Sequence, residues 1–356
     1  MQVKGESNKS SANFVQSLSW KSKLHPKGIK ASPDGLCCLV SGEDTAIKLY
    51  EWNQPTSPVF SIPTGGTLYD FCWYPQMNSA NPATCAFLTT SAGVPVHMRD
   101  GFTGSLLASY VGRNHLDQVC SPNAVTFNAC GTSIITSSER MIHIFDVQRP
   151  TDGPTSIRPL RKGHDQNGIL GSLASNPDFS KTFAVGSYTG TTCIYDEREP
   201  GELMRLIGAH QSSAGITQVQ FSNDGKFLFT GARKSPFIYC WDIRNTRESI
   251  AQFERVSNNN QRIAFDLHPS GSYLVTGSQD FQAIVYNTKD CSVVARIKEL
   301  PDAVNGVSIV PSTSSFSVAL CTGKRYFSLS PDMESDDEQS EAEKNVIQLW
   351  NVHIQS

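Results

Sequence analysis

One short unit recurs seven times along this chain, and its spacing limits the fold more than any other feature. In its most complete form, an apolar segment enters a turn at Asp224-Gly225, a second segment ends in Thr230-Gly231, and a third ends in Trp241-Asp242. Successive copies lie 49, 46, 50, 46, 45 and 64 residues apart. A period of this length indicates repeated copies of one supersecondary unit that pack on their neighbours. The third segments end at Tyr50-Glu51, Arg99-Asp100, Phe145-Asp146, Tyr195-Asp196, Trp241-Asp242, Tyr286-Asn287 and Trp350-Asn351.

The segments within each unit have the character of β-strands. They are short, rich in β-branched, aromatic or other apolar residues, and bounded by Gly, Pro, Ser or Asp, as residues 36–40 and 272–276 illustrate. Strands that end in Ser/Thr-Gly and in aromatic-Asp, with a period of roughly 40–45 residues, are typical of a WD40 propeller blade. We therefore predict an all-β fold, a seven-bladed WD40 β-propeller, that forms one domain over residues 13–356. Residues 1–12 are polar, and we expect them to form a mobile tail.

The end of the chain leaves the last blade short of a strand. Only six residues follow Trp350, too few for a turn and a fourth strand. Residues 13–20 alternate apolar and polar side chains and precede the first blade. We predict that this segment supplies the outer strand of blade seven, because joining the two ends closes the ring and removes two exposed sheet edges. A loose N-terminal arm is the alternative.

Cysteine usage and hydropathy restrict the compartment. The ten cysteines form no C-x-x-C pair and no Cys/His spacing typical of a metal site, and Cys72, Cys193 and Cys240 fall within expected strands. Buried free thiols are typical of a reducing compartment. No apolar run approaches the ~20 residues that cross a membrane, and residues 1–12 lack the apolar core of a signal peptide. We expect a cytosolic or nuclear monomer with no membrane partner and no cofactor or metal.

The net charge of −3 is unevenly distributed. Residues 332–343 hold seven of the 33 acidic residues and no Lys or Arg, so the rest of the chain has 26 acidic against 30 basic residues. This run falls between the second and third strands of blade seven, where the last spacing is longer than the others. We expect residues 331–344 to form a solvated acidic loop inserted in the last blade. Ser335 and Ser340, each followed by acidic residues, are candidate phosphorylation sites that would add further negative charge.

The order of strands decides which loops share a face. The turns between the second and third strands of each blade, and the links between blades, open on one side, which we call the upper face. Arg233 and Lys234 lie in such a turn, at a position where many WD40 blades place a structural Asp. Arg and Lys contact phosphates, and Arg or aromatic planes stack on unpaired bases. This pair is therefore a candidate RNA contact, with a solvated turn as the alternative.

Three further upper-face segments carry candidate RNA-binding residues. Gln261 and Arg262 enter blade six from this face, and a salt bridge to a neighbouring blade is their alternative role. Asn114 and His115 follow blade two. Tyr69 lies at the start of the first strand of blade two, where core packing is the alternative.

Several segments are more particular than a generic blade requires. They are residues 68–75 (LYDFCWYP), 114–117 (NHLD), 230–234 (TGARK), 260–263 (NQRI) and 305–308 (NGVS). At these blade positions the chain resembles the telomerase Cajal body WD40 family. The resemblance covers roughly residues 14–352 and includes the acidic interruption of the last blade. Because WD repeats alone occur in many unrelated proteins, the resemblance depends on these segments.

The resemblance implies an RNA-binding scaffold. Members of this family recognise the Cajal-body box, a short loop sequence of H/ACA-type small Cajal-body RNAs and telomerase RNA, and direct these ribonucleoproteins to Cajal bodies. It implies a nuclear location, small Cajal-body RNA and telomerase ribonucleoprotein as partners, and further protein partners on the propeller faces. Family members usually carry a long low-complexity N-terminal tail, which is nearly absent from this sequence.

The sequence favours no enzyme class. It contains no P-loop, no G-x-S-x-G and no zinc pattern, so we predict that the protein is not an enzyme. A different class of function is a peptide-binding WD40 adaptor, such as a ubiquitin-ligase substrate receptor. An adaptor of that kind would favour an acidic or apolar central mouth over upper-face Arg and Lys.

Overall fold

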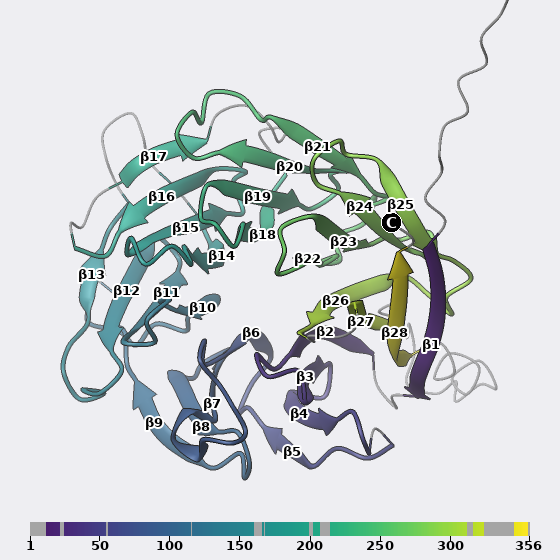
Figure 1. Cartoon of the computed structure of the whole chain (residues 1–356). Helices are drawn as coiled ribbons and strands as arrows, with labels where there is room; N and C mark the ends of the chain where they lie inside the picture. Colours follow the sequence, from purple (N-terminus) through teal and green to yellow (C-terminus); the bar gives the residue numbers. More distant parts are fainter. Residues whose placement is uncertain are drawn as a thin grey trace, which may run out of the picture.

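Seven four-stranded antiparallel sheets are arranged as blades around a central axis, as Figure 1 shows. This computed structural model describes residues 12–21, 25–54, 56–114, 116–159, 166, 168–198, 202–206, 214–311, 316–323 and 345–354. The arrangement confirms the predicted seven-bladed β-propeller. A short 3-10 helix, η1 (Pro82–Thr84), lies in the connection between the first two strands of blade two.

The four strands of each blade lie in order from the channel outward. The innermost strands are β2 (Pro26–Ala31), β6 (Leu68–Trp73), β10 (Ala124–Phe127), β14 (Leu170–Ser175), β18 (Ile216–Phe221), β22 (Phe265–Leu267) and β26 (Val304–Val310). The second strands are β3 (Cys37–Gly42), β7 (Ala86–Ser91), β11 (Ser133–Ser138), β15 (Thr182–Ser187), β19 (Phe227–Ala232), β23 (Tyr273–Gly277) and β27 (Phe316–Thr322). The third strands are β4 (Ala46–Glu51), β8 (Val96–Asp100), β12 (Met141–Asp146), β16 (Thr192–Asp196), β20 (Phe237–Asp242), β24 (Ala283–Asn287) and β28 (Val346–Ile354). The outer strands are β5 (Phe60–Pro63), β9 (Leu106–Tyr110), β13 (Thr155–Ile157), β17 (Glu202–Leu206), β21 (Ala251–Glu254), β25 (Val293–Ile297) and β1 (Ala12–Lys21).

The ends of the third strands confirm the repeat boundaries predicted from the sequence. The third strands of the first six blades end at the Glu, Asp or Asn that closes each unit, from Glu51 in β4 to Asn287 in β24. In blade seven, β28 continues past Asn351 to Ile354. This extension gives β28 the length to pair with a long outer strand.

The hydrophobic core is divided among the interfaces between blades. Between blades five and six, for example, Phe229 and Phe253 pack with Phe265, and all three side chains are at most 4% exposed. Comparable clusters lie between every other pair of adjacent blades, including blades seven and one. Burying a side chain of this size contributes about 1.5–3 kcal/mol. Each blade is therefore stabilised by its two neighbours, and the ring depends on its closure.

The N-terminal strand closes the ring, as predicted. β1 pairs antiparallel with β28, in a register that runs from Ala12 opposite Ile354 to Lys21 opposite Val346, with a bulge between Gln16 and Leu18. The sheet order β1-β28-β27-β26 makes β1 the outer strand of blade seven. In Figure 1 the purple β1 lies beside the yellow β28. Residues from the two ends of the chain thus share one sheet.

The turn between the first and second strands is built differently in the complete repeat of blade five and in blade four, which departs from it. In blade five Gly225 adopts φ +69°, and a Cβ there would lie 2.3 Å from Asn176 Oδ1 in blade four, so the turn requires glycine. Blade four has no glycine in this turn. Phe179 and Lys181 there take φ of +62° and +63°, while Asp178 Oδ1 accepts a hydrogen bond from Ser180 N at 2.8 Å. An Asp side chain can hold such a turn locally.

Several predictions concern residues outside the described part of the chain. The tail up to residue 11, the acidic residues 332–343 and the serines Ser335 and Ser340 belong to this group. The ten cysteines are all described and none is recorded in a disulfide, and Cys72, Cys193 and Cys240 lie in strands as predicted. Among the described residues, no helix is long and apolar enough to cross a membrane.

Candidate functional site

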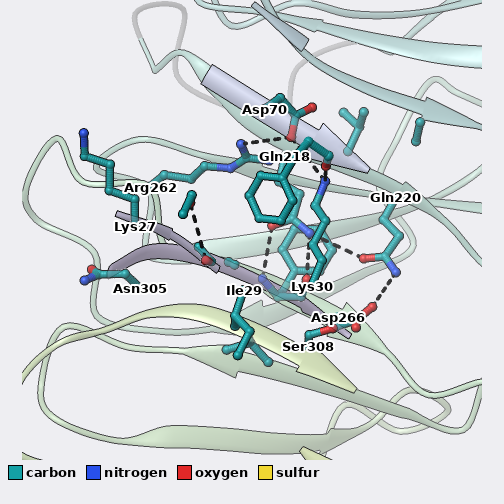
Figure 2. Close-up of a pocket in the computed structure, with 18 of the residues that line it drawn as sticks. Lys27, Ile29, Lys30, Asp70, Gln218, Gln220, Arg262, Asp266, Asn305 and Ser308 are labelled. Carbon is teal, nitrogen blue, oxygen red and sulfur yellow. Dashed lines mark hydrogen bonds and ion pairs between the residues drawn. The ribbon is translucent and has the colours of Figure 1, made fainter. Parts of the chain in front are cut away.

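The channel along the propeller axis contains a cavity of about 1040 Å³. Its lining comes from the inner strands and from the upper-face link over residues 259–262, and it extends to Pro177 and Asn223 in the turns of the opposite face. Figure 2 shows polar side chains from several blades that point into it. The cavity therefore runs through the channel and gathers residues that are far apart in the sequence.

A buried carboxylate, Asp70, organises one side of this channel. Asp70 is 6% exposed, and its Oδ1 lies 3.2 Å from Lys30 Nζ of blade one. Its Oδ2 accepts a hydrogen bond from Val125 N of blade three at 3.2 Å. Lys30 also lies over the ring of Phe71, with Nζ 5.1 Å from the ring centroid. The Asp70 side chain thus connects three consecutive inner strands.

Arg262 reaches the same carboxylate from the other side of the channel. Its Nη1 lies 4.0 Å from Asp70 Oδ1, and 38% of the Arg262 side chain is exposed. The salt bridge considered for Arg262 therefore exists, but its partner lies in blade two rather than in a neighbouring blade. Only Arg262 is half-exposed in this pair, and its contact with the buried Asp70 is longer than the 3.2 Å contact of Lys30. Because the single carboxylate of Asp70 pairs with both Lys30 and Arg262, these three side chains together keep an excess positive charge.

A second buried acid, Asp266, connects blades five, six and seven. Its Oδ1 accepts from Gln220 Nε2 at 2.7 Å and its Oδ2 from Ile309 N at 2.7 Å. Burial raises the pKa of Asp266, although these hydrogen bonds act in the opposite direction. Asp266 and Asp70 thus lie on the inner strands of blades six and two, at different positions along the strand, and each accepts a backbone hydrogen bond from the next inner strand. Both carboxylates stabilise the ring, and both already accept hydrogen bonds from neighbouring blades.

The link into blade six is anchored by a buried arginine. Arg255 is 2% exposed, and its Nη1 donates to Ile263 O at 2.7 Å. Burial lowers the pKa of Arg255 to about 10. This contact holds the residue that follows Arg262, so Arg255 positions the link that carries Gln261 and Arg262.

Gln261 presents an unused donor at the upper mouth of the channel. Its Oε1 accepts from Asn259 Nδ2 at 2.7 Å, and its backbone N donates to Asn259 Oδ1 at 3.0 Å. The Gln261 Nε2 atom is buried and has no hydrogen-bond partner among the described residues. Leaving such a donor unpaired costs about 1–3 kcal/mol. The carboxamide is therefore held in place, and its NH₂ group has no acceptor in the described part of the chain.

Arg233 is held at the mouth by an aromatic ring. Its Cζ lies 4.2 Å from the ring centroid of Tyr188, which lies in the corresponding turn of blade four. At Gly171 a Cβ would lie 2.2 Å from Tyr188 Cε1, so glycine makes room for this ring. Tyr188 was missed in the sequence. An aromatic residue in the turn between the second and third strands was the available signal.

Two more lysines lie at the upper face, in different settings. Lys27 lines the cavity and has its Nζ 4.0 Å from Glu43 Oε1. Lys234 is exposed, adopts φ +52°, and does not line the cavity although it follows Arg233 directly. The predicted pair is thus divided: Arg233 faces the channel and Lys234 lies on the surface beside it.

Tyr69 is exposed at the channel mouth. Its side chain is 42% exposed and lines the cavity, between the buried Leu68 and Asp70. The alternative role of core packing is therefore wrong for Tyr69. Its ring can provide a surface on which a base or another planar group stacks.

Comparisons with known proteins agree with this architecture. The family model described as WD domain, G-beta repeat matches residues 201–242 and 255–287. The chain is 32% identical to Telomerase Cajal body protein 1 of Bos taurus over 347 residues, which are 92% of this chain and 63% of the relative. It is 33% identical to the protein of the same name from Homo sapiens over 350 residues, 92% of this chain and 62% of the relative. Over most of its length the chain is therefore similar to proteins named Telomerase Cajal body protein 1.

The match covers 92% of this chain, which spans a little under two thirds of the length of those two relatives, 63% and 62%. A further relative is Guanine nucleotide-binding protein negative regulator 1 of Schizosaccharomyces pombe. It is 26% identical over 371 residues, which are 95% of this chain and 88% of that protein. The similarity to these relatives therefore extends over nearly the whole of this propeller.

One of the segments that resembles the telomerase Cajal body WD40 family lies away from the channel. Asn114 does not line the cavity, and its Oδ1 accepts hydrogen bonds from Leu116 N at 2.9 Å and Gln118 N at 3.0 Å. Its Nδ2 donates to Gln118 Oε1 at 3.0 Å. The Asn114 side chain thus organises its own loop. His115 lies outside the described residues.

The propeller brings part of the predicted set together. Arg233, Gln261, Arg262 and Tyr69 line one cavity, whereas Lys234 and Asn114 do not. No three His, Cys, Asp or Glu side chains within the described ranges lie close enough to hold a metal ion. The site therefore consists of cations, amides and aromatic rings around a channel mouth.

Proposed function

We propose that this propeller is an RNA-binding scaffold. It binds an unpaired loop of H/ACA-type small Cajal-body RNA, or of telomerase RNA, at the upper mouth of the channel. By recognising the Cajal-body box in that loop, it directs the ribonucleoprotein to Cajal bodies in the nucleus. The observation that carries this proposal is the convergence of Lys27, Arg233 and Arg262 with the link amides and the exposed Tyr69 ring around one opening.

These groups suit a short RNA loop for physical reasons. Phosphates are neutralised by Arg and Lys, and splayed bases stack on aromatic or guanidinium planes and hydrogen-bond to amides. Of the mouth residues, Lys27 has Glu43 beside it, whereas Arg233 has no acidic partner within the described part of the chain. The opening therefore has positive charge available to a polyanion.

A basic peptide, the ligand of an adaptor, fits this opening less well. The two buried carboxylates of the channel, Asp70 and Asp266, already accept hydrogen bonds from neighbouring blades. Lys30 and Arg262 also lie against Asp70. A cationic peptide would have to displace these partners and would meet Arg233 at the mouth.

The scaffold part of the proposal is supported by the similarity to named relatives. Two relatives bear the name Telomerase Cajal body protein 1. A closed propeller has two faces and an outer rim, so RNA bound at the channel mouth leaves other surfaces for proteins. Binding and delivery to Cajal bodies can then be properties of one molecule.

A salt titration with two matched triple variants tests RNA binding at this face. The first variant carries R233A, K234A and R262A. The control carries R149A, K226A and R244A, three exposed cations in turns of the opposite face. Each phosphate contact contributes about 0.7 to the slope of log K against log salt for a single strand. We expect the first variant to lose affinity and to flatten the slope by up to about 2, while the control stays close to the parent.

The RNA in this titration is a hairpin whose loop carries the Cajal-body box, compared with the same hairpin bearing a scrambled loop. Preference for the box supports recognition of the loop. Equal losses in the two triple variants would show charge-driven binding without a defined site. Failure of the parent to bind either RNA, together with tight binding of a basic peptide, would favour the adaptor function.

A further inference from the structure

We infer that Tyr188, Arg233 and Gln261 form a pocket for one unpaired nucleobase at the channel mouth. The base stacks on the guanidinium plane of Arg233, which Tyr188 supports from behind, and the amide of Gln261 donates a hydrogen bond to the base edge. This inference rests on the proposed RNA binding and names the group of the RNA that this part of the mouth holds.

The stack of Tyr188 and Arg233 is formed before any ligand arrives. The Arg233 Cζ lies 4.2 Å from the Tyr188 ring centroid, a distance typical of a cation–π contact. Backbone contacts fix both turns: Tyr188 N donates to Ile169 O at 2.8 Å, and Arg233 N donates to Gly215 O at 2.9 Å. The guanidinium plane is thus oriented by its neighbours, which lowers the entropy cost of binding.

Two glycines lie close to Tyr188 and support this geometry. A Cβ on Gly171 would lie 2.2 Å from Tyr188 Cε1, and a Cβ on Gly215 would lie 3.0 Å from Tyr188 Cα. Both positions accept only a residue without a side chain unless Tyr188 moves. The two glycines therefore create the space in which the ring backs Arg233.

The position of Arg233 directs its second face toward the channel. Arg233 lines the cavity and Tyr188 does not, so the guanidinium lies between the ring and the open space. The other cations of the lining, Lys27, Lys30 and Arg262, each lie within 4.0 Å of a carboxylate. Arg233 has no such partner within the described ranges, and its Nε is buried without a hydrogen bond there. A guanidinium held by stacking rather than by an ion pair is suited to stack on a base.

Gln261 adds a donor at the same mouth. Asn259 holds both the side-chain oxygen and the backbone N of Gln261, and the Nε2 atom is buried without a partner among the described residues. A fixed donor selects a base that presents an acceptor, such as the O6 or N7 of guanine or the O4 of uracil. The pocket therefore favours such a base over one that presents only a donor at that edge.

Three conservative variants separate stacking from charge. R233K keeps the charge and removes the plane, while Y188L removes the supporting ring and Y188F keeps it. Base stacking on such a platform corresponds to about 5- to 150-fold in affinity. We expect R233K and Y188L to weaken binding of the hairpin with the Cajal-body box at least about fivefold at every salt concentration. Their salt slopes should stay unchanged, and Y188F should bind like the parent.

A scan of the RNA then identifies the base. Abasic nucleotides are placed one at a time along the loop, and one position should weaken the parent by about the same factor as Y188L. The same abasic RNA should bind Y188L and the parent equally, because the two changes remove one contact. Melting curves of R233K, Y188L and Y188F that match the parent confirm that the propeller is intact, and R233K replaces Y188L in the abasic comparison if Y188L unfolds.

The outcomes distinguish this inference from the proposed function. If the parent binds the hairpin with a salt slope that R233A, K234A and R262A flatten, but R233K and Y188L bind like the parent, Arg233 contacts phosphate and the base pocket is wrong. The pocket would also be overturned if removing the base weakened RNA binding to Y188L by the same factor as RNA binding to the parent. If the parent does not bind the RNA, the proposed function fails first.

Discussion

Removing the closing strand tests the fold at its most sensitive point. Deleting residues 1–21 takes away β1 (Ala12–Lys21), whereas deleting residues 1–11 leaves it in place. β1 makes nine paired positions with β28. If each pair contributes one backbone hydrogen bond at roughly 0.5–1.5 kcal/mol, the loss is roughly 5–13 kcal/mol. That is comparable to the whole stability of a typical domain, about 5–15 kcal/mol.

The loss converts into a shift of melting temperature. With about 2.1 cal/mol/K of unfolding entropy per residue over 356 residues, we expect the melting temperature to fall by about 7–17 °C. The exposed edge of β28 should also pair with other chains, so the variant should aggregate on heating. The removed strand includes Leu18, which packs against the cluster between blades seven and one.

Differential scanning calorimetry with light scattering measures both effects. The chain lacking residues 1–11 is the matched control and should melt like the full chain without new aggregation. Equal melting temperatures for the two deletions would show that β1 is a loose arm and that the ring is stable without it. Equal and large losses in both would assign the stabilisation to residues 1–11 instead.

Three further predictions follow from particular contacts. In blade five, Trp241 Nε1 donates to Thr230 Oγ1 at 3.0 Å, so Thr230→Val leaves a buried donor unpaired and should lower the free energy of unfolding by about 1–3 kcal/mol in a urea titration. Burial raises the pKa of Cys240 and Cys321 to about 12. Because the unfolded thiols ionise near pH ~8.5, the stability should fall as pH rises above that value, by up to about 1.4 kcal/mol per pH unit for each thiol, and these thiols should resist alkylation at pH 8 until denaturant is added. Replacing residues 332–343 with a Gly/Ser linker of equal length should tighten RNA binding most at low salt, where screening is weakest. If the linker variant and the parent bind with equal affinity at low salt and again at high salt, the acidic run serves solvation alone.

The fold was predictable because the same local pattern is repeated in every blade. Turn residues and strand ends such as Asp242 mark each copy, and a missing fourth strand after Trp350 required a partner from the other end of the chain. Drift in one copy did not alter the prediction, since blade four closes its turn with Asp178 and a left-handed Phe179 in place of glycine. Packing on neighbouring blades enforces what local sequence leaves ambiguous.

The site was predictable only in part, because it depends on side-chain directions across the channel. Strand order places Arg233, Arg262 and Tyr69 on the upper face, and these three residues do line one cavity. That Arg262 meets Asp70 of blade two could not be deduced, since this contact crosses the ring. The local role of Asn114 in its own loop was equally hidden.

Tyr188 was missed for a related reason. In the sequence it is an ordinary turn residue before Thr189 and Gly190, and nothing there shows that Arg233 of the next blade lies on its ring. The contact joins equivalent turns of adjacent blades. Comparing the same turn position in successive repeats would have identified the pair.

Photo-crosslinking tests the central claim most directly. A hairpin whose Cajal-body box loop carries 4-thiouridine is irradiated with the full chain, and the cross-linked peptides are identified by mass spectrometry. We predict cross-links in peptides that contain Tyr69, Tyr188 or residues 259–262, which surround the upper mouth of the channel. Cross-links confined to the opposite face, for example residues 222–226 or 242–246, or to the outer strands would contradict RNA binding at this mouth.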